Sequence, residues 1–424
     1  MSAIASLAVI GCVAVLSAPI AAQESRPSAP PELRNVVEAY LAEREESTAG
    51  KLLEEVLRRP DATGPNVLAA VIASDAPVVA SMDLHVPHKD QLLVATVRAP
   101  EGHARSGPRL PVVFDIGNGP SVAHLSLERD AVVAFVPGYT PPEFSDEGRD
   151  GFLKVLRTAA HRAHGDPDRA WLCGFSWAGH ASYDVALHRP RSVRGIVPMG
   201  GGPRRSWFRL LPQLAPVRVI AFCGQNDDPE LVWNLREVDR LAPKHKLSWA
   251  LKLDPAKGHT LPLDGLEGVA AFVRETPAID PADQVLGTVL ADAALVESWL
   301  VRIDAVDQAR VAVPARVPVS ADLTPDGQRR ATIAAMASKV AMLGWHIEEK
   351  KAETLLTLTP DGVSSATIFL REAWFKQGRK ATVLARGRKL WSGVVAPDPK
   401  TVLSEARRTG ERLRPALISV ALRF

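Results

Sequence analysis

Short apolar runs alternate with longer amphipathic stretches between residues 78 and 276. Apolar runs of this length, bounded by turn-forming residues, are typical of buried strands, whereas apolar residues three and four positions apart are typical of helices. Strands that alternate with helices form a mostly parallel sheet with helices on both faces, so an α/β domain is predicted over 78–276. We expect a helix over 146–163 and strands over 78–86, 92–98, 110–116, 131–137, 193–198, 217–224 and 247–253.

Residues 23–77 lack this alternation and precede the predicted sheet. A linker rich in Pro and Ser covers 23–31, and a helix is predicted over 31–59 because residues such as Leu33, Val37 and Tyr40 recur at helical spacing. We interpret this N-terminal helical segment as a packing element of the fold. Binding of a partner is the alternative interpretation.

A third region, 277–424, begins with a Pro-rich linker at 277–281. Its pattern indicates a smaller C-terminal α+β accessory module without a catalytic constellation. Strands are predicted near 298–305, 309–317, 345–358, 366–374 and 380–385, and helices near 324–343 and 399–412. A basic patch is interpreted as the solvated face of a hairpin, with weak contact to an anionic polymer or membrane surface as the alternative. Its members are Arg379, Lys380, Arg386, Arg388 and Lys389.

Residues 1–22 contain no charged side chain and are rich in Ala, Val, Leu and Ile. The segment ends in small residues before a polar stretch, which is typical of a secretory signal peptide, although the usual basic start is missing. We predict cleavage near Ala22 and a secreted or periplasmic protein. An uncleaved membrane anchor and a lipoprotein formed at Cys12 are alternatives, but Pro19 interrupts an apolar run that is marginal for a membrane span.

Composition narrows the class of protein. With 424 residues, of which 46% are hydrophobic and 23% are charged, the chain can bury the core of one large domain and of a smaller one. Disordered and fibrous classes are therefore excluded. The spacing of His85 and His88 suits no common metal-binding helix, and no nucleic-acid motif is present. No metal or other cofactor is expected.

The sequence Gly174-Phe175-Ser176-Trp177-Ala178 carries the strongest chemical signal. Here an apolar run meets a serine between small residues and then turns into a predicted helix. A serine hydroxyl is a weak nucleophile, so an enzyme must hold it on a tight turn beside a base and backbone N–H donors. The small residues two before and two after Ser176 let strand and helix approach closely enough for that turn. Ala178 stands where the usual G-x-S-x-G motif has its second Gly.

Two further predicted strands end near residues that complete a Ser-His-Asp triad. The strand at 217–224 leads into a turn that contains Asp227, and the strand at 247–253 is followed by a loop that contains His259. His259 is the candidate base and Asp227 is the candidate acid that orients it, with Asp228 as the alternative acid. The chain order Ser, Asp, His is that of α/β-hydrolases and differs from the orders of chymotrypsin-like and subtilisin-like enzymes.

A serine hydrolase also needs backbone donors where negative charge develops on the attacked carbonyl. One donor of this oxyanion hole is expected to be the N–H of Trp177, directly after the serine. The other is expected from the loop that follows the strand at 110–116. Its glycines permit backbone geometries that other residues resist, and the candidates for the donor are Ile116, Gly117 and Asn118.

The segment 166–180, together with the motifs at 183–184, 188–190 and 195–201, resembles secreted bacterial α/β-hydrolases of the esterase and polyhydroxybutyrate-depolymerase-like group. It is also similar to prolyl-oligopeptidase-type peptidases. The resemblance covers about residues 80–276 and implies an α/β-hydrolase fold. It further implies that the nucleophile is Ser176, that the general base is His259 and that the residue orienting the base is Asp227.

Two positions depart from the family pattern, namely Ala178 for the common Gly and Asp115 where many esterases have His. An acidic group at Asp115 opposes the stabilisation of an anion unless it points away or is neutralised. The family sheet also places one strand between those that carry Cys173 and Cys223. The backbones of such strands lie about 9 to 10 Å apart, beyond the roughly 4.4 to 6.8 Å between the Cα atoms of a disulfide. We therefore predict two buried free thiols.

The segment 200–209 lies between a strand end and the strand of the acid, where these enzymes often insert a cap. Trp207 and Phe208 are candidates to line an acyl or aromatic pocket, and Arg204 or Arg205 to bind a substrate carboxylate. A glycine turn followed by a surface helix is the alternative. The sequence as a whole predicts a secreted serine hydrolase, most directly a carboxylesterase that acts on a small-molecule or polymeric ester. A peptidase and a weakened hydrolase fold that acts as a binding protein are the alternatives.

Overall fold

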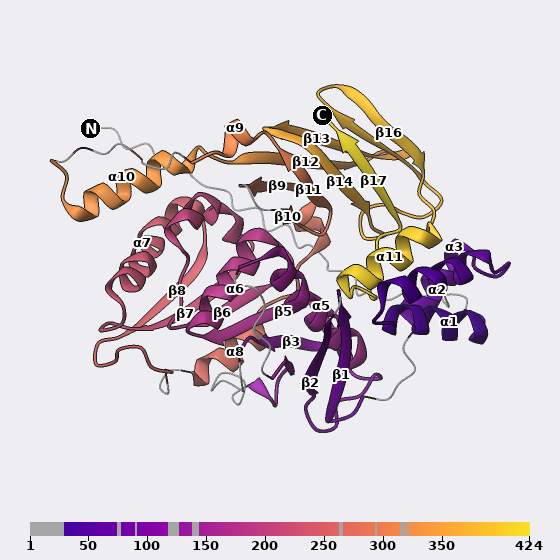
Figure 1. The fold of residues 1–424 in the computed structure, drawn as a ribbon, viewed down its shortest axis with the longest axis horizontal. Coiled ribbons are helices and arrows are strands. Elements are labelled where there is room, and N and C mark those ends of the chain that lie inside the picture. Colours follow the sequence, from indigo (N-terminus) through magenta and orange to yellow (C-terminus); the bar gives the residue numbers. More distant parts are fainter. Residues whose placement is uncertain are drawn as a thin grey trace, which may run out of the picture.

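The computed structural model describes residues 29–73, 78–89, 91–117, 127–137, 144–262, 266–292, 295–313, 317, 320 and 322–424. Figure 1 shows three parts, which are a set of N-terminal helices, a central domain built on a large sheet, and a C-terminal part with two smaller sheets. The predicted signal peptide at 1–22 lies outside the described residues, as does most of the linker at 23–31. Within the described ranges, no helix has the length and apolar character that a membrane crossing requires.

The central sheet contains eight strands in the order β1-β2-β4-β3-β5-β6-β7-β8. β2 runs antiparallel to β1 and β4, and all pairs from β4 through β8 along the sheet are parallel. The predicted mostly parallel sheet is thus confirmed, and each predicted strand is present within a few residues of its expected bounds. The strands are β1 (Ser81–His88), β2 (Gln91–Arg98), β3 (Leu110–Asp115), β4 (Val132–Phe135), β5 (Gly165–Phe175), β6 (Gly195–Met199), β7 (Arg218–Gly224) and β8 (Ser248–Asp254).

Helices cover both faces of this sheet, as predicted. α5 (Asp146–Arg162), α6 (Trp177–His188) and α7 (Pro229–His245) bury their apolar side chains in one large cluster on one face. α8 (Glu267–Glu275) contributes to a smaller cluster on the other face. Burial of both faces explains why the parallel strands read as continuous apolar runs instead of alternating ones.

Three short helices occupy the N-terminal part, where a single helix was expected over 31–59. α1 (Pro31–Ala42) and α2 (Glu46–Arg58) are separated by an extended backbone, which at Glu45 has φ −82° and ψ 119°. The carboxylate of Glu45 accepts hydrogen bonds from the hydroxyls of the second and third residues of α2, at 3.0 and 2.8 Å. These bonds favour a new helix start over continuation of α1. α3 (Gly64–Ile72) follows.

The C-terminal part contains a four-stranded sheet of order β10-β11-β14-β17 and a five-stranded sheet of order β16-β15-β13-β12-β9. Its described residues also include the 3-10 helix Pro281–Gln284 and the α-helices α9 (Gln308–Val311), α10 (Pro325–Ala337) and α11 (Pro399–Thr409). The strands are β9 (Leu286–Ala291), β10 (Val296–Glu297), β11 (Val301–Val306), β12 (Ala341–Glu349), β13 (Glu353–Asp361), β14 (Val363–Leu370), β15 (Lys380–Ala385), β16 (Arg388–Val394) and β17 (Ile418–Arg423).

Three predicted elements of this part are wrong in type or extent, and the first two concern helices. The strand expected over 309–317 begins instead as α9, because the carboxylate of Asp307 accepts a hydrogen bond from the N–H of Ala309 at 3.0 Å and caps a helix. The helix expected over 324–343 ends at Ala337, since the residues from Ala341 onward pair with two strands as β12. Tertiary pairing therefore overrides local helical character there.

The single strand expected over 345–358 is a hairpin. β12 and β13 pair antiparallel, and the turn between them is closed by the N–H of Lys350, which donates to the carbonyl of Glu353 at 2.9 Å. β16 was not predicted, because it is an edge strand that starts in basic residues and buries little. The exposed Arg386, Arg388 and Lys389 lie around the turn between β15 and β16.

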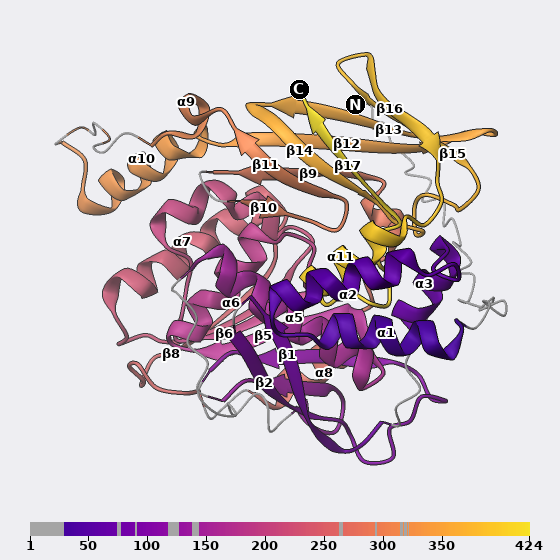
Figure 2. The same ribbon diagram turned by 45° about the vertical axis from the view of Figure 1, so that its right-hand side comes forward.

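The N-terminal helices share one hydrophobic core with the C-terminal part, and Figure 2 shows them beside α11. Leu33 and Val37 of α1 and Val67 of α3 are fully buried in the same cluster as Val402 and Leu403 of α11. Apolar side chains from both C-terminal sheets complete this cluster. The two ends of the described chain therefore stabilise each other.

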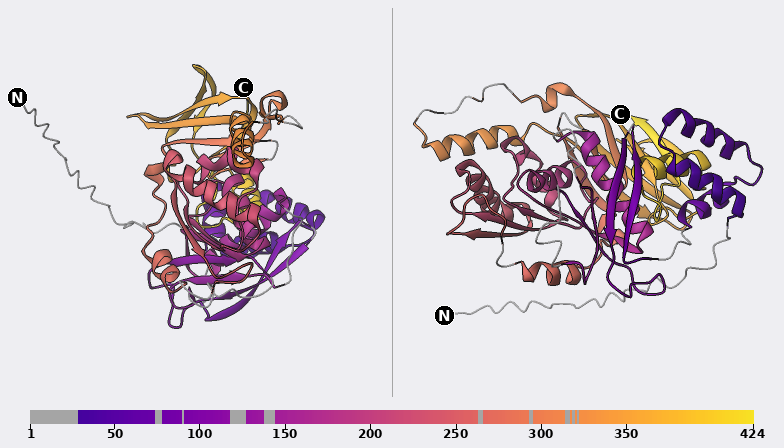
Figure 3. Two further views of the ribbon diagram at one scale, coloured as in Figure 1. Left: turned by 90° about the vertical axis from the view of Figure 1, so that its left-hand side faces the viewer. Right: turned by 60° about the horizontal axis from the view of Figure 1, so that its bottom comes forward.

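The C-terminal part is also packed onto the central domain, over which its sheets lie in Figure 3. Ile333 and Met336 of α10 belong to the large cluster of the central domain. Arg209 of the central domain forms an ion pair with Asp292, next to the end of β9, at 3.0 Å. The contact between the two parts thus combines apolar burial with a buried charge pair.

The close contact between β5 and β6 gives a stability test. A Cβ at Gly195 would lie 2.1 Å from a ring carbon of the fully buried Trp171, so Gly195→Ala forces the core to shift. We expect the free energy of unfolding to fall by about 1–3 kcal/mol in urea denaturation. Gly50→Ala is the control, because no atom lies within 4 Å of a Cβ at that helical position and the change should stabilise by roughly 0.5–1 kcal/mol. Equal effects at both sites would contradict the packing described.

Candidate functional site

Ser176 lies at the turn between β5 and α6. Its backbone has φ 58° and ψ −119°, a conformation that residues other than glycine rarely adopt and that costs free energy. The N–H of Ser176 donates to the carbonyl of Met199 at the end of β6, at 2.8 Å, which holds the turn against the neighbouring strand. A strand, a strained turn and a helix in this order form a nucleophile elbow, which presents a serine hydroxyl above the sheet.

Small residues on both sides allow this turn. A Cβ at Gly174 would lie 2.5 Å from the Cβ of Ala178 and 2.6 Å from the carbonyl oxygen of Ile116. Gly174 is therefore required, whereas Ala178 is tolerated because its methyl group occupies the space that Gly174 leaves. A Cβ at Gly179 would in turn lie 3.0 Å from the carbonyl oxygen of Met199. These contacts confirm that small residues let strand and helix approach here.

The structure brings Ser176, His259 and Asp227 together. The Oγ atom of Ser176 lies 2.8 Å from Nε2 of His259, and Nδ1 of His259 lies 3.0 and 2.9 Å from the two carboxylate oxygens of Asp227. Asp227 is only 8% exposed, whereas the side chain of His259 is 47% exposed. A buried carboxylate can hold an imidazole in one orientation while the other edge of the ring stays accessible to a substrate.

Two loops that leave neighbouring strands position the acid and the base. A Cβ at Gly224, the last residue of β7, would lie 2.2 Å from the carbonyl oxygen of Gly258 in the loop after β8, so this glycine lets the loops touch. The N–H groups of Gln225 and Asn226 donate to the carbonyls of the last residue of β8 and of Lys257 in the loop after it, at 2.8 and 2.9 Å. The distance between acid and base is thus set by backbone contacts and not by the side chains alone.

Asp228, the alternative acid, has a different place. Its carboxylate accepts hydrogen bonds from the N–H groups of Glu230 at 2.8 Å and Leu231 at 3.1 Å and caps α7. The N–H of Asp228 donates to the carboxylate of Asp227 at 2.7 Å, which helps to fix that carboxylate. Of the two candidate acids, Asp227 is therefore the one that faces the histidine.

The four candidate oxyanion donors differ in whether their N–H groups already donate a hydrogen bond. The N–H of Ile116 donates to the carbonyl of Cys173 at 2.8 Å, so the expectation that Ile116 supplies a donor is corrected. This bond continues the pairing of β3 with β5 to the last residue of the strand predicted over 110–116. Among the described residues, the N–H groups of Gly117 and Trp177 have no hydrogen-bond partner. Asn118 lies outside the described residues.

Asp115 is the last residue of β3 and is 1% exposed. Its register partners are Phe135 on β4 and Cys173 on β5. Because side chains alternate along a strand, Asp115 shares a face of the sheet with Val113, which packs in the cluster under α8. A buried acidic residue thus lies two positions before Gly117, which is one of the candidate oxyanion donors.

Most of the residues predicted to line a substrate pocket are instead buried in the core or ion-paired. Trp207 and Phe208 are 6% and 4% exposed and belong to the core of the central domain, so they do not form an open pocket wall. They lie on the 3-10 helix Arg205–Leu214, whose apolar side turns inward. Arg205 forms an ion pair with Glu230 at 3.0 Å. The observed structure of 200–209 is a glycine turn followed by a short helix, without an inserted cap.

An aromatic side chain missed by sequence reasoning lies beside the serine turn. The ring of Phe144 lies 6.4 Å from the ring of Trp177 and 5.2 Å from the ring of Trp207. The exposed Arg204 places its guanidinium carbon 3.8 Å from the centre of the Phe144 ring. Arg204, Phe144 and Trp177 therefore form a continuous cationic and aromatic wall. No periodic pattern surrounds Phe144 in the sequence, so no signal pointed to it.

Both cysteines of the central domain are free thiols, as predicted, and Cys223 is not suited to act as a nucleophile. Cys173 and Cys223 are buried free thiols on strands with β6 between them. Burial and the nearby charge of Asp227 raise the pKa of the Cys223 thiol to about 12, so it stays protonated at neutral pH and is a poor nucleophile. Within the described part of the chain, no group of three or more His, Cys, Asp or Glu side chains is placed to hold a metal ion.

The strand order and the serine turn define the class of this protein as an α/β-hydrolase fold. No known protein family and no curated protein matches the sequence. Solved structures similar to this chain include an acylaminoacyl peptidase from Pyrococcus horikoshii, with 11% identity and a TM-score of 0.40. They also include dipeptidyl peptidase 4 from Porphyromonas gingivalis, with 14% identity and a TM-score of 0.37, and a putative dienelactone hydrolase from Klebsiella pneumoniae, with 14% identity and a TM-score of 0.36.

The similarity covers only part of each chain. The match to the acylaminoacyl peptidase covers 47% of this chain and 42% of that one, and the match to the dipeptidyl peptidase covers 46% and 35%. The match to the dienelactone hydrolase covers 47% of this chain and 96% of that one. This chain thus spans less than half the length of the two peptidases.

Asp227 faces the histidine and Asp228 caps α7, and this role of Asp228 can be tested. Asp228→Ala removes two hydrogen bonds to the start of α7, and we expect the free energy of unfolding to fall by about 1 kcal/mol in chemical denaturation. Asp228→Asn keeps a side-chain oxygen for the cap and should cost much less. Equal losses in the two variants would show that the side chain does not act as a helix cap.

Proposed function

We propose that this protein is a serine hydrolase that cleaves carboxylic esters through an acyl-enzyme. The observation that supports this function most directly is the continuous hydrogen-bond chain from Ser176 through His259 to Asp227, with distances of 2.8 Å and 2.9–3.0 Å. The strained backbone of Ser176 supports it as well, because strain of this kind concentrates at functional sites.

In the acylation step, the Oγ atom of Ser176 attacks the ester carbonyl carbon while Nε2 of His259 accepts the hydroxyl proton. Asp227 holds Nδ1 of the ring in the protonated form and stabilises the imidazolium that results. The N–H groups of Trp177 and Gly117 are the proposed donors to the oxyanion. Collapse of the tetrahedral intermediate breaks the bond to the alkoxide, which leaves with the proton from His259.

In the deacylation step, water attacks the acyl group on Ser176. His259 accepts a proton from this water and returns it to the Oγ atom of Ser176 as the carboxylic acid leaves. The same hydrogen-bond chain therefore serves both half reactions. The exposure of the His259 side chain, at 47%, is consistent with access for this water.

An ester requires less of this site than an amide does. An ester expels its leaving group more readily, so it requires less stabilisation of the tetrahedral intermediate. A peptidase of the prolyl-oligopeptidase type and a hydrolase fold that serves as a binding protein are the competing functions.

Labelling with a fluorophosphonate tests whether Ser176 is a nucleophile. We expect the protein to be labelled, Ser176→Ala to abolish the label, and Asp227→Asn to lower kcat for ester hydrolysis by about 10⁴-fold because the histidine loses its orientation. Asp228→Asn is the matched control and should keep normal labelling, since that carboxylate caps α7. A label that persists in Ser176→Ala, or a folded protein that takes none, would favour the binding-protein function.

A pair of matched substrates separates an esterase from a peptidase. Unactivated ethyl esters and anilides of the same acyl group present one acid with two leaving groups, so differences in kcat/KM report the leaving group alone. We expect kcat/KM for the ester to exceed that for the anilide by at least about a hundredfold. Comparable turnover of the anilide, or efficient cleavage of short peptides, would establish the peptidase function instead.

A further inference from the structure

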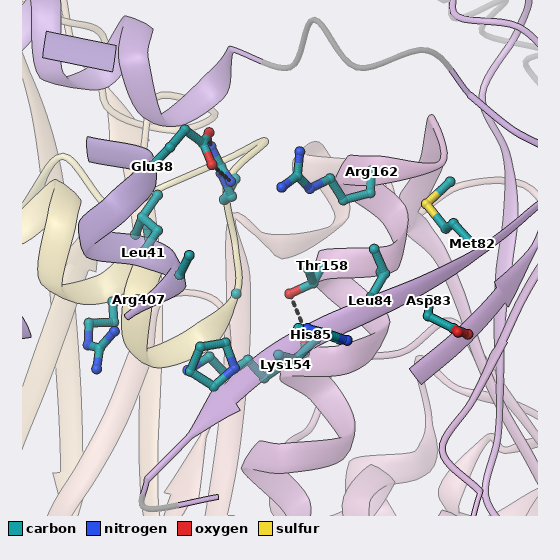
Figure 4. A pocket seen from close by; sticks show the side chains of 16 residues that line it. Glu38, Leu41, Met82, Asp83, Leu84, His85, Lys154, Thr158, Arg162 and Arg407 are labelled. Atoms are coloured by element: carbon teal, nitrogen blue, oxygen red, sulfur yellow. Dashed lines mark hydrogen bonds and ion pairs between the residues drawn. The ribbon is translucent and has the colours of Figure 1, made fainter. Parts of the chain in front are cut away.

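A cavity of about 390 Å³ lies where the N-terminal helices, the edge of the central sheet and α11 meet (Figure 4). Its walls come from α1, β1, α5 and α11, and none of its lining residues belongs to the serine site. A second cavity of about 590 Å³ adjoins α2 and shares Lys154 and Arg407 with the first. Both volumes lie in the range of small-molecule binding sites.

Lys154 of α5 is the unusual group in this cavity. It is 8% exposed, and within the part of the chain that the structure describes its Nζ atom has no hydrogen bond and no ion pair. Burial, followed by the charge of Arg407, lowers the pKa of Lys154 to about 8. The ammonium form still dominates at pH 7, but a buried cation without a counter-ion is unfavourable. An anion placed next to it would offset that cost.

The carboxylates nearest Lys154 are ion-paired with arginines, and among the described residues none of them forms an ion pair with Lys154 itself. These ion pairs are Glu38 with Arg412 (3.1 Å), Glu46 with Arg407 (2.8 Å) and Asp150 with Arg189 (2.9 Å). Asp83, which also lines the cavity, accepts a hydrogen bond from the hydroxyl of Thr96 at 3.0 Å. Positive charge therefore remains uncompensated on the wall that α5 contributes.

A second cation lies on the same face of α5. Arg162 is eight residues after Lys154, with Thr158 between them, and Figure 4 shows the three along one side of the helix. Among the described residues, the guanidinium of Arg162 also has no hydrogen bond or ion pair. Gly410, which ends α11 with φ 72°, packs against this face, since a Cβ there would lie 3.1 Å from Cγ of Lys154 and from Oγ1 of Thr158. The cations are thus held between two helices.

The rest of the cavity wall has more apolar than polar residues. Leu41 of α1 lies across from Thr158 of α5, and β1 contributes further apolar side chains. A bare inorganic ion would leave this surface without contact, whereas an organic anion can cover it. The apolar members of the wall are Leu41, Ala42, Met82, Leu84, Val86, Pro87 and Ala406.

We propose that this cavity binds a small organic carboxylate. Lys154 pairs with its carboxylate group, Arg162 acts as the second cation, and an apolar chain lies against the accessible side chains of Leu41, Ala42 and Met82. A monoanion fits because Lys154 is the one buried ammonium without an ion pair among the residues that the structure describes. The ligand would contact all three parts of the chain, so its binding stabilises their association as well as satisfying Lys154.

Isothermal titration of the full chain with octanoate tests this site. We expect saturable binding that is equal in the wild-type protein and in Ser176→Ala, which separates it from product binding at the serine. Lys154→Met should weaken the affinity by at least about tenfold, and Lys154→Arg should restore part of it. Lys89→Met is the matched control, because Lys89 lines the adjoining cavity but is exposed and paired with Glu147 at 2.8 Å.

Two neutral or shortened probes complete the test. Octanamide lacks the charge and acetate lacks the chain, so each should bind at least about tenfold more weakly than octanoate. Lys154→Met removes an uncompensated buried charge and is expected to fold with an unchanged or higher Tm, and Arg162→Gln at a half-buried position is the second variant. The absence of saturable octanoate binding, equal affinity in Lys154→Met, or loss of binding only in Ser176→Ala would overturn the proposal.

Discussion

The left-handed backbone of Ser176 is the constraint on which the rest of the central domain depends. A residue with a Cβ keeps φ 58° only if its surroundings leave no alternative. Here the carbonyl of Met199 holds the N–H from one side, and the absence of a side chain at Gly174 lets α6 begin close to β3 and β5. The order of the strands then places the ends of β7 and β8 where their loops can reach the serine. A change in any of these contacts would move the hydroxyl.

Charged side chains are arranged differently at the serine site and in the cavity beside Lys154. At the serine site, one buried carboxylate meets one exposed imidazole, so the charge that forms during a reaction has a partner in advance. In the cavity beside α11, arginines outnumber the carboxylates, and Lys154 has no ion pair with any described residue. The first arrangement is complete without a ligand, whereas the second has an electrostatic cost that a ligand can remove.

Sequence reasoning succeeded where one local pattern determines the outcome and failed where distant pairing does. The inner strands β3, β4 and β6 of the central sheet are buried on both faces, so their apolar runs are visible in the sequence. The acid and the base follow strand ends, which share one edge of a parallel sheet. The occupied N–H of Ile116 depends on the pairing of β3 with β5, and the burial of Trp207 depends on the side of a short helix that turns inward. The local sequence around Lys154 is typical of a solvent-exposed helix position, because the burial of this residue by α11 leaves no signal in the neighbouring sequence.

The core shared by the N-terminal helices and the C-terminal sheets has a consequence for the order of folding. α1 to α3 are made first, but their apolar faces find their partners only when α11 and β17 have been made, more than 300 residues later. Until then these helices lack the tertiary contacts that short helices need for stability in water. The strands of the central sheet all lie between Ser81 and Asp254, whereas the outer core joins helices and strands from both ends of the described chain, so closure of that core is a late and non-local event. A chain built in this way acquires its final stability only after its last strand is in place.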